Sequence, residues 1–237
     1  MNFRLRLDGA VYNSAAMVRF LFRLFDRLMG GQWGCPQGPL GWLAARLMVF
    51  GNRAMNELAV AALGVKQGES VLEIGFGPGD LLERLAKGSG AGVVAGIDPS
   101  RAMAGGARRR LRRQIEAGLV RIDEGRSSAM PYQDGSFDRV LTVNTIYFWE
   151  QPPADVREIR RVLKPGGLLV LVFRAIPDEG GGLRVHGIPA HISVENVRGW
   201  MREAGFDQLS EQTKEAPFGP EVITAVALSG TASGTSG

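Results

Sequence analysis

The stretch VLEIGFGPG, residues 71–79, decides the fold, and DLLERLAKG, residues 80–88, follows it directly. The apolar run that ends at Ile74 predicts a buried strand, and the second segment has the spacing of an amphipathic helix that stops at Gly88. The three glycines between strand and helix allow a sharp turn and a close approach of a ligand to the backbone. The first N–H groups of the helix are free to bind that ligand. The unit therefore predicts a cofactor-binding loop.

Outward from this loop, residues 66–229 alternate between apolar strand patterns and helical patterns. Alternating elements of this kind favour an α/β fold with a buried, mostly parallel sheet and helices on both faces. Two short strand patterns near 207–213 and 221–228 have no helix between them, so they predict an antiparallel hairpin at one edge. We expect strands at 71–74, 91–98, 119–125, 137–145 and 168–173, and helices at 80–88, 101–113, 153–163 and 194–204, with a tight turn at LKPGG, residues 163–167.

The two ends of the chain have a different character. Residues 1–65 have helical patterns at 15–29 and from about 40 to 63, separated by a Gly/Pro-rich link, and we expect a helical lid. In segment 15–29 the arginines Arg19, Arg23 and Arg27 share one face and Phe/Leu side chains cover another. Residues 230–237 contain no large apolar side chain and predict a disordered tail.

Composition excludes several classes of protein. The 237-residue chain contains no apolar run approaching the roughly 18 residues that span a bilayer, and its N-terminus lacks a signal-peptide pattern. Cys35 is the single cysteine, which excludes an internal disulfide framework and a four-cysteine zinc site. With two histidines only, we expect no metal site, and we expect a cytoplasmic protein, with peripheral membrane contact as an option.

Asp98 extends the glycine motif into a specific prediction. It ends the second strand, 19 residues beyond Gly79, where a carboxylate can accept bonds from ribose hydroxyls. Dinucleotide enzymes use G-x-G-x-x-G, whereas the spacing here is E-x-G-x-G-x-G. Together with GIDPS, AMPYQDGSFDRV and RVLKPGGLLVLV, this spacing resembles the class I S-adenosylmethionine methyltransferases of the ubiquinone/menaquinone type over residues 66–228.

The resemblance implies a Rossmann-like, seven-stranded, mostly parallel sheet with one antiparallel edge strand and an N-terminal helical lid. It also implies S-adenosylmethionine as cofactor, S-adenosylhomocysteine as product, and no metal. In relatives an aspartate at the register of Arg126 binds the adenine amine, so we expect Arg126 to contact the adenine ring and Ser127 to substitute for the acid. The cofactor residues implied are Glu73, Gly75, Phe76, Gly77, Gly79, Asp98, Pro99, Ser100, Arg126, Ser127 and Asn144.

The methyl acceptor is less defined by the sequence. Asn144-Thr-Ile-Tyr147 has the spacing of the N-P-P-Y motif of amino-group methyltransferases without its prolines. Tyr147, Phe148 and Trp149 are candidates to line an apolar acceptor pocket. His186 and His191, in a loop-like stretch, are candidate bases because the histidine pKa lies near neutrality. We therefore predict catalytic roles for His186, His191 and Tyr147, and a small, apolar or aromatic acceptor.

Three other functions remain open at this stage. A phospholipid N-methyltransferase would use residues 15–29 as a membrane anchor, although this helix is equally suited to cover the active site or a second subunit of a homodimer. An RNA methyltransferase would use the arginines at 108–113, but no RNA-binding module accompanies them and we expect no nucleic-acid partner. A catalytically inactive scaffold would keep the cofactor loop alone.

Overall fold

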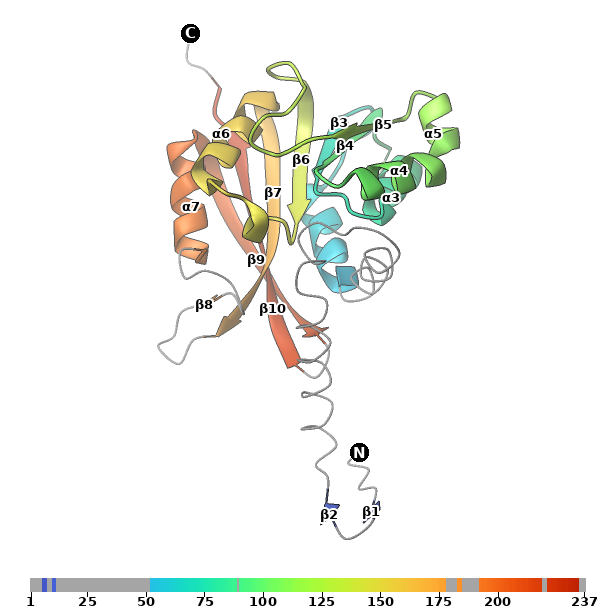
Figure 1. The fold of residues 1–237 in the computed structure, drawn as a ribbon. Coiled ribbons are helices and arrows are strands. Elements are labelled where there is room, and N and C mark those ends of the chain that lie inside the picture. Colours follow the sequence, from blue (N-terminus) through green and yellow to red (C-terminus); the bar gives the residue numbers. More distant parts are fainter. Residues whose placement is uncertain are drawn as a thin grey trace.

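The computed structural model describes residues 6–7, 10–11, 52–88, 90–177, 183–184, 192–218 and 221–234. Seven strands form one sheet in the order β5-β4-β3-β6-β7-β10-β9, and helices cover both of its faces (Figure 1). This arrangement confirms the predicted α/β fold with a seven-stranded, mostly parallel sheet. The strands are β3 (Ser70–Ile74), β4 (Val93–Asp98), β5 (Val120–Glu124), β6 (Phe137–Val143), β7 (Leu163–Pro177), β9 (Phe206–Phe218) and β10 (Glu221–Ala232), and a short strand, β8 (Leu183–Arg184), pairs with the end of β7.

The parallel part of the sheet has β3 in the middle. β3 pairs with β4 on one side and β6 on the other, and Glu73 is opposite Gly96 and Leu141. The carboxyl ends of β3, β4, β5 and β6 therefore lie at the same edge of the sheet. The loops that follow these strands carry the glycine motif, Asp98, Arg126 and Asn144, so the strand register brings the predicted cofactor residues to one edge.

The sequence predicted one antiparallel strand at the edge of the sheet, and the antiparallel strand is β10, one place in from the edge. It runs antiparallel to β7 and to β9, and β9 forms the outermost strand of the sheet. Both hairpin strands are longer than the sequence patterns indicated, because the pairing continues from Glu221 opposite Phe218 to Ala232 opposite Phe206.

Alternating residues of the strands pack into two hydrophobic cores, one on each face of the sheet. One core receives Leu72, Val140 and Leu171 from the strands, and α6 and α7 pack on it. The other receives Val71, Leu141 and Val170, and α3, α4 and a helix at residues 52–63 pack on it. The helices are α3 (Asp80–Gly88), α4 (Arg101–Arg110), α5 (Arg112–Glu116), α6 (Pro152–Val162) and α7 (Val194–Glu203), with a 3-10 turn, η2 (Ile146–Phe148).

The predicted turn at LKPGG lies inside β7. Phe137 of β6 is opposite Leu163, whereas Arg139 is opposite Leu168. Over this stretch β7 therefore advances by five residues while β6 advances by two. Gly166 has a φ of 77°, which lets the extra residues leave the ladder and return. The segment is a bulge within the strand, because its two ends pair with nearly the same point of β6.

The arginine cluster on α4 and α5 is largely engaged within the protein. Arg110 forms ion pairs with Asp80 and Glu83 of α3, and Arg108 donates to the carbonyl of Ile122 on β5. Arg112 pairs with Glu116 along α5. The contacts of Arg108 and Arg110 attach α4 to β5 and α3.

The N-terminal prediction needs two corrections. The helix at residues 52–63 belongs to the domain core, because Met55, Ala59 and Leu63 are fully buried against the sheet. The strands β1 (Arg6–Leu7) and β2 (Ala10–Val11) pair antiparallel in a region that we expected to be helical. The residues between them in the sequence are Asp and Gly, a pair typical of a two-residue hairpin turn. The predicted helix at 15–29 and the Gly/Pro-rich link lie outside the described residues.

The disordered C-terminal tail was predicted to begin at residue 230, but the last strand extends to Ala232. Residues 230–232 continue β10, and Thr231 is opposite Leu168 of β7. Packing leaves no room for a side chain at Gly230, since a Cβ there would lie 2.5 Å from Leu209 Cδ2 and 2.9 Å from Met201 Cε. The low apolar content that predicted disorder here reflects a crowded position in the sheet.

Candidate functional site

A cavity of about 800 Å³ opens at the carboxyl ends of β3, β4, β5 and β6. In open α/β sheets this edge is where ligands bind. The helix at residues 52–63 contributes Asn52 and Asn56 to its wall, and α6 contributes Ala154 and Asp155. Nine of the eleven predicted cofactor residues line this cavity: Glu73, Gly75, Phe76, Gly77, Asp98, Pro99, Arg126, Ser127 and Asn144.

The three glycines of the loop have different tasks. All have positive φ, and a Cβ at Gly75 would collide with the side chain of Thr145. A Cβ at Gly79 would lie 3.2 Å from Ala107 Cβ, so this glycine allows α3 to begin close against α4. At Gly77 nothing lies within 4 Å of such a Cβ. The cavity is therefore open above Gly77, where a ligand can touch the backbone.

Asp98 organises the loop as well as facing the cavity. Its Oδ2 accepts the Gly77 backbone N–H at 2.9 Å and its Oδ1 accepts the Ser100 N–H at 2.8 Å. Burial raises the pKa of the Asp98 carboxyl, against these two bonds, which favour the charged form. A carboxylate has further lone pairs beyond the two used here, so it can still accept hydroxyl groups of a ligand.

Glu73 carries an incomplete set of hydrogen bonds. The side chain is buried, and Oε2 has no partner among the described residues. Burial, followed by the charges of Asp98 and Asp80, raises the pKa of Glu73 well above its usual range. An unsatisfied acceptor of this kind is costly unless a ligand supplies the donor, and a cationic donor would meet that need.

A second polar group lies on the β5 side of the cavity. Arg126 is exposed and forms an ion pair with Glu150. Ser127 donates its hydroxyl to Asp155 Oδ1, and both side chains are buried. Asp155 Oδ2 has no partner among the described residues, and burial raises the pKa of this carboxyl.

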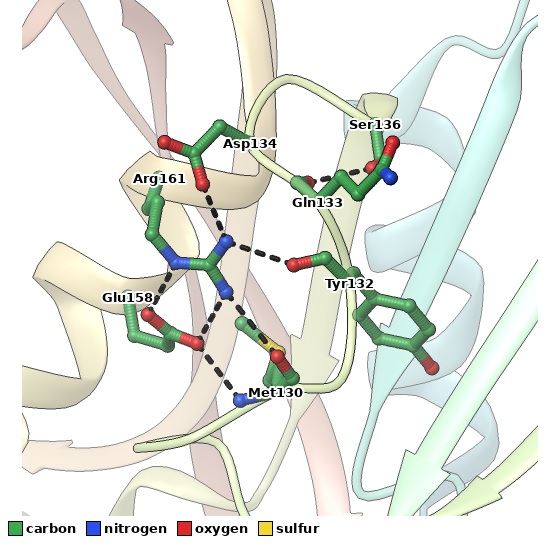
Figure 2. A network of polar contacts seen from close by, with 7 residues as sticks. All are labelled: Met130, Tyr132, Gln133, Asp134, Ser136, Glu158 and Arg161. Carbon is green, nitrogen blue, oxygen red and sulfur yellow. Dashed lines mark hydrogen bonds and ion pairs between the residues drawn. The ribbon is translucent and has the colours of Figure 1, made fainter.

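Arg161 of α6 holds the chain that follows this polar group (Figure 2). Its guanidinium donates to the carbonyls of Met130 and Tyr132 and pairs with Asp134 and Glu158. Glu158 in turn accepts the Met130 N–H at 2.8 Å. These contacts hold the connection between β5 and β6, which also carries Ser127, against α6, which carries Asp155.

On the β6 side, Asn144 joins two parts of the wall. Its φ of 57° is uncommon for a residue other than glycine and turns the chain sharply after β6. Its side-chain amide donates to Asn52 Oδ1 at 2.8 Å, which attaches the helix at 52–63 to the end of the strand. Asn52 also accepts a bond from Arg174.

The predicted aromatic lining is present in part. Phe148 and Trp149 line the cavity, and Phe148 is 48% exposed. Tyr147 is absent from the lining. Its hydroxyl accepts the Arg174 N–H at 2.5 Å and lies 3.4 Å from Asn144 Oδ1, and burial raises its pKa. Tyr147 is thus placed to support the wall rather than to contact an acceptor.

Other predicted residues lie away from the cavity or outside the described chain. Gly79 packs α3 on α4, and Ser100 is the N-cap of α4, where its hydroxyl accepts the Met103 N–H. The candidate bases His186 and His191 fall outside the described residues, so their catalytic role stays a prediction.

Sequence reasoning missed Asn52, Asn56, Glu150 and Asp155. One signal was available for Asp155, since it shares a helical face with Ile159 and Val162, at spacings of four and seven residues. An acid on the apolar face of a helix indicates a buried polar site. No pattern marked the two asparagines, because they reach the cavity through tertiary packing.

The cavity has a marked charge preference. The described residues of its wall include one arginine, Arg126, and five acidic side chains: Glu73, Asp80, Asp98, Glu150 and Asp155. Glu150 is paired with Arg126 and Asp80 with Arg110, and the other three carboxyl groups have no cationic partner among the described residues. Such a field favours a cationic ligand and disfavours a pyrophosphate. The site therefore suits a positively charged nucleoside better than a dinucleotide.

Comparisons with known proteins show the family to which the chain belongs. The methyltransferase domain family matches residues 72–171. The uncharacterized methyltransferase YdaC of Bacillus subtilis (strain 168) is 33% identical over 179 residues, covering 73% of this chain and 90% of the relative. The ubiquinone/menaquinone biosynthesis C-methyltransferase UbiE of Proteus mirabilis (strain HI4320) is 31% identical over 199 residues, covering 69% of this chain and 77% of the relative.

A solved structure shows the same fold. The geranyl diphosphate C-methyltransferase of Streptomyces coelicolor A3(2), in complex with Mg²⁺, geranyl diphosphate and S-adenosyl-L-homocysteine, superposes with a TM-score of 0.61 at 16% identity. The match covers 76% of this chain and 79% of that structure. The fold and cavity define a Rossmann-like methyltransferase domain. The chain belongs to the class I S-adenosylmethionine-dependent methyltransferase family.

Among the described residues, no helix combines the length and apolar character needed to cross a membrane.

Proposed function

We propose that this protein transfers the methyl group of S-adenosylmethionine to a small, apolar or aromatic acceptor. The observation that carries this proposal is the acidic cavity above Gly77, in which a buried oxygen of Glu73 has no hydrogen-bond partner among the residues that the structure describes. The cofactor has an ammonium and a sulfonium group, and both charges complement this wall. When bound, it supplies an already activated methyl group, so the protein has mainly to align the donor with the acceptor.

The residues of the cavity fit the cofactor part by part. Glu73 would accept the ammonium group with its free oxygen, and the open backbone at Gly77 would pass beneath the methionine chain. Asp98 would accept the ribose hydroxyls while it keeps the loop amide of Gly77 in place. Pro99 and Arg126 would flank the adenine ring, with the planar guanidinium of Arg126 against its face.

The acceptor would meet the part of the wall that the cofactor leaves free. Phe148, Trp149, Asn52 and Asn56 all line the cavity, so its wall offers apolar surface and neutral polar groups. Such a lining suits a small acceptor that is mainly apolar and carries one polar group. The relatives named for C-methylation and the geranyl diphosphate enzyme support an acceptor of this kind. His186 and His191 remain the proposed bases for an acceptor that must lose a proton.

A turnover assay tests the proposal. Purified full-length protein is incubated with methyl-labelled S-adenosylmethionine and a panel of small aromatic and prenylated acceptors, and the products are resolved by mass spectrometry. We expect S-adenosylhomocysteine to form in equal amount to one methylated acceptor, and Asp98→Ala to lower this rate. Transfer to phospholipid vesicles alone would establish the lipid alternative. Binding of S-adenosylhomocysteine without transfer to any acceptor would favour the scaffold function.

A further inference from the structure

Asp155 and Ser127 form a buried polar pair that the roles above leave unused. The Ser127 hydroxyl donates to Asp155 Oδ1, while Asp155 Oδ2 has no partner among the described residues. Asp155 is 2% exposed and yet forms part of the cavity wall. A buried carboxylate oxygen without a donor is destabilising, so its retention beside a cavity points to a ligand that supplies the missing N–H group.

The sheet order indicates which part of the cofactor would lie there. Asp98, at the end of β4, is the ribose-binding acid of the proposed function, and the glycine loop follows β3 on one side of β4. β5 pairs with β4 on the other side. The methionine and the base are carried on opposite sides of the ribose, so a ligand with its methionine over β3 directs its base toward the end of β5. Residues 125–128 follow β5, and Asp155 is bonded to this segment.

We propose that Asp155, held by Ser127, recognises the exocyclic amine of the adenine and selects it against a base with a carbonyl at that position. The proposal rests on the proposed function, because it assumes the same cofactor. Asp155 Oδ2 accepts an N–H of the amine, and the soft χ2 torsion of aspartate lets the carboxylate turn toward the ring. Arg126 cannot take this role, because a guanidinium has donors only.

The surroundings keep this acceptor in position. Glu158 and Arg161, on the same helix as Asp155, bind the backbone of Met130 and the carbonyl of Tyr132. The chain that carries Ser127 is therefore fixed on α6. A site built to accept a hydrogen bond rejects a ligand that presents an oxygen instead, since two acceptors then face each other without a donor.

Competitive calorimetry with two nucleosides tests this inference. The probes are S-adenosylhomocysteine and S-inosylhomocysteine, which differ at the position of the amine, titrated at mildly alkaline pH so that the carboxyl is ionised. We expect the wild-type protein to prefer the adenosyl compound by about 10- to 100-fold. Asp155→Asn should lower this preference at least several-fold, because the amide can donate to the inosyl oxygen. Ser127→Ala should lower it less, through a less ordered carboxylate.

Three control variants separate recognition from a structural effect. Asp134→Asn removes an exposed carboxylate from the same contact between α6 and the loop, and should leave both affinities unchanged. Asp98→Asn and Arg126→Ala should weaken both probes equally and keep their ratio.

Equal binding of both probes to the wild-type protein would overturn the inference, whether or not the Asp155 variant folds. An Asp155→Asn protein with both affinities lowered and the ratio unchanged would reduce Asp155 to a structural residue. Loss of the preference for the adenosyl compound in Arg126→Ala, with the preference unchanged in Asp155→Asn, would also overturn the inference. Failure of the wild-type protein to bind either probe would refute the proposed cofactor itself, which is a different outcome from loss of selectivity.

Discussion

At the scale of single residues, the site depends on two acceptors and one open glycine. Glu73 and Asp155 each keep a buried oxygen that has no hydrogen-bond partner in the described part of the chain, and both residues line the cavity. Gly77 lines the same cavity, and a Cβ at this position would meet no described atom within 4 Å. Buried polar groups without hydrogen bonds lower the stability of the fold. The free protein should therefore be less stable than the protein with a bound ligand that supplies the missing donors.

Glu73 predicts a proton release that accompanies binding. Its pKa is raised in the free protein by burial and by Asp98 and Asp80, whereas an ammonium ion beside it favours the charged form. We expect S-adenosylhomocysteine to displace protons, measured as a dependence of the calorimetric enthalpy on the ionisation enthalpy of the buffer. Glu73→Gln should reduce the number of protons released and weaken binding by about 1.5–3 kcal/mol. An unchanged proton release in that variant would exclude Glu73 as the acceptor.

Alanine substitutions at Gly77 and Gly79 should have different main effects. We expect Gly77→Ala to affect mainly the affinity for the cofactor and Gly79→Ala mainly the stability of the fold. Gly77→Ala should cost about 1–2 kcal/mol of stability through its positive φ, yet lower the affinity for S-adenosylhomocysteine strongly, because the methyl group enters the cavity. Gly79→Ala adds a close contact with Ala107 to the same backbone strain, so its melting temperature should fall further. Thermal melts and titrations of both variants decide this. A larger affinity loss for Gly79→Ala than for Gly77→Ala at equal stability would contradict the assignment of the two glycines.

At the scale of elements, the site is held by contacts between α6 and the β5–β6 connection. Arg161 is the centre of these contacts, with four partners in a small volume (Figure 2). The ion pair with Glu158 is only partly exposed. Arg161 also donates to the Tyr132 carbonyl and to the Met130 carbonyl, which accepts the Tyr132 N–H as well. The geometry of the Ser127–Asp155 pair therefore depends on a residue outside the cavity.

Arg161→Ala should lower the free energy of unfolding by about 2–4 kcal/mol, because it removes several hydrogen bonds and leaves Glu158 without its cation. Urea denaturation measures this change. Arg202→Ala is a matched control, since its ion pair with Glu195 spans 3.7 Å between exposed side chains and should contribute less than about 0.5 kcal/mol. Equal effects of the two substitutions would show that the network does not hold the loop.

For the whole molecule, local sequence patterns predicted the sheet, but they did not predict which helices complete the wall of the cavity. The apolar runs and the glycine loop were sufficient to predict the strands along the chain, because each pattern is contained in a few neighbouring residues. The order of the strands in the sheet was not predicted. The roles of Asn52 and Asp155 were not predicted, because their positions depend on packing between elements far apart in the sequence. The place of Gly230 in β10 was not predicted for the same reason, since the space that a side chain would need there is filled by Met201 and Leu209.

The buried helix at 52–63 predicts different outcomes for two truncations. Deletion of residues 1–65 removes Met55, Ala59 and Leu63 from the core and should prevent folding, detected as loss of a cooperative melt. Deletion of residues 1–30 leaves that helix intact, and the proposed lid predicts a folded protein that binds cofactor but loses acceptor turnover. A collapse of the melting temperature on deletion of 1–30 would indicate a structural segment. A cooperative melt after deletion of 1–65 would contradict the core packing described above.

Binding of S-adenosylmethionine in the acidic cavity underlies every role proposed for its residues. Calorimetric titration of the full-length protein with S-adenosylhomocysteine and with NAD tests this binding. We expect clear binding of S-adenosylhomocysteine, weaker or no binding of NAD, and a loss of about 1.5–3 kcal/mol for S-adenosylhomocysteine in Asp98→Ala, where the bonds to the ribose are removed. Tighter binding of NAD than of S-adenosylhomocysteine, or an unchanged affinity in Asp98→Ala, would contradict it.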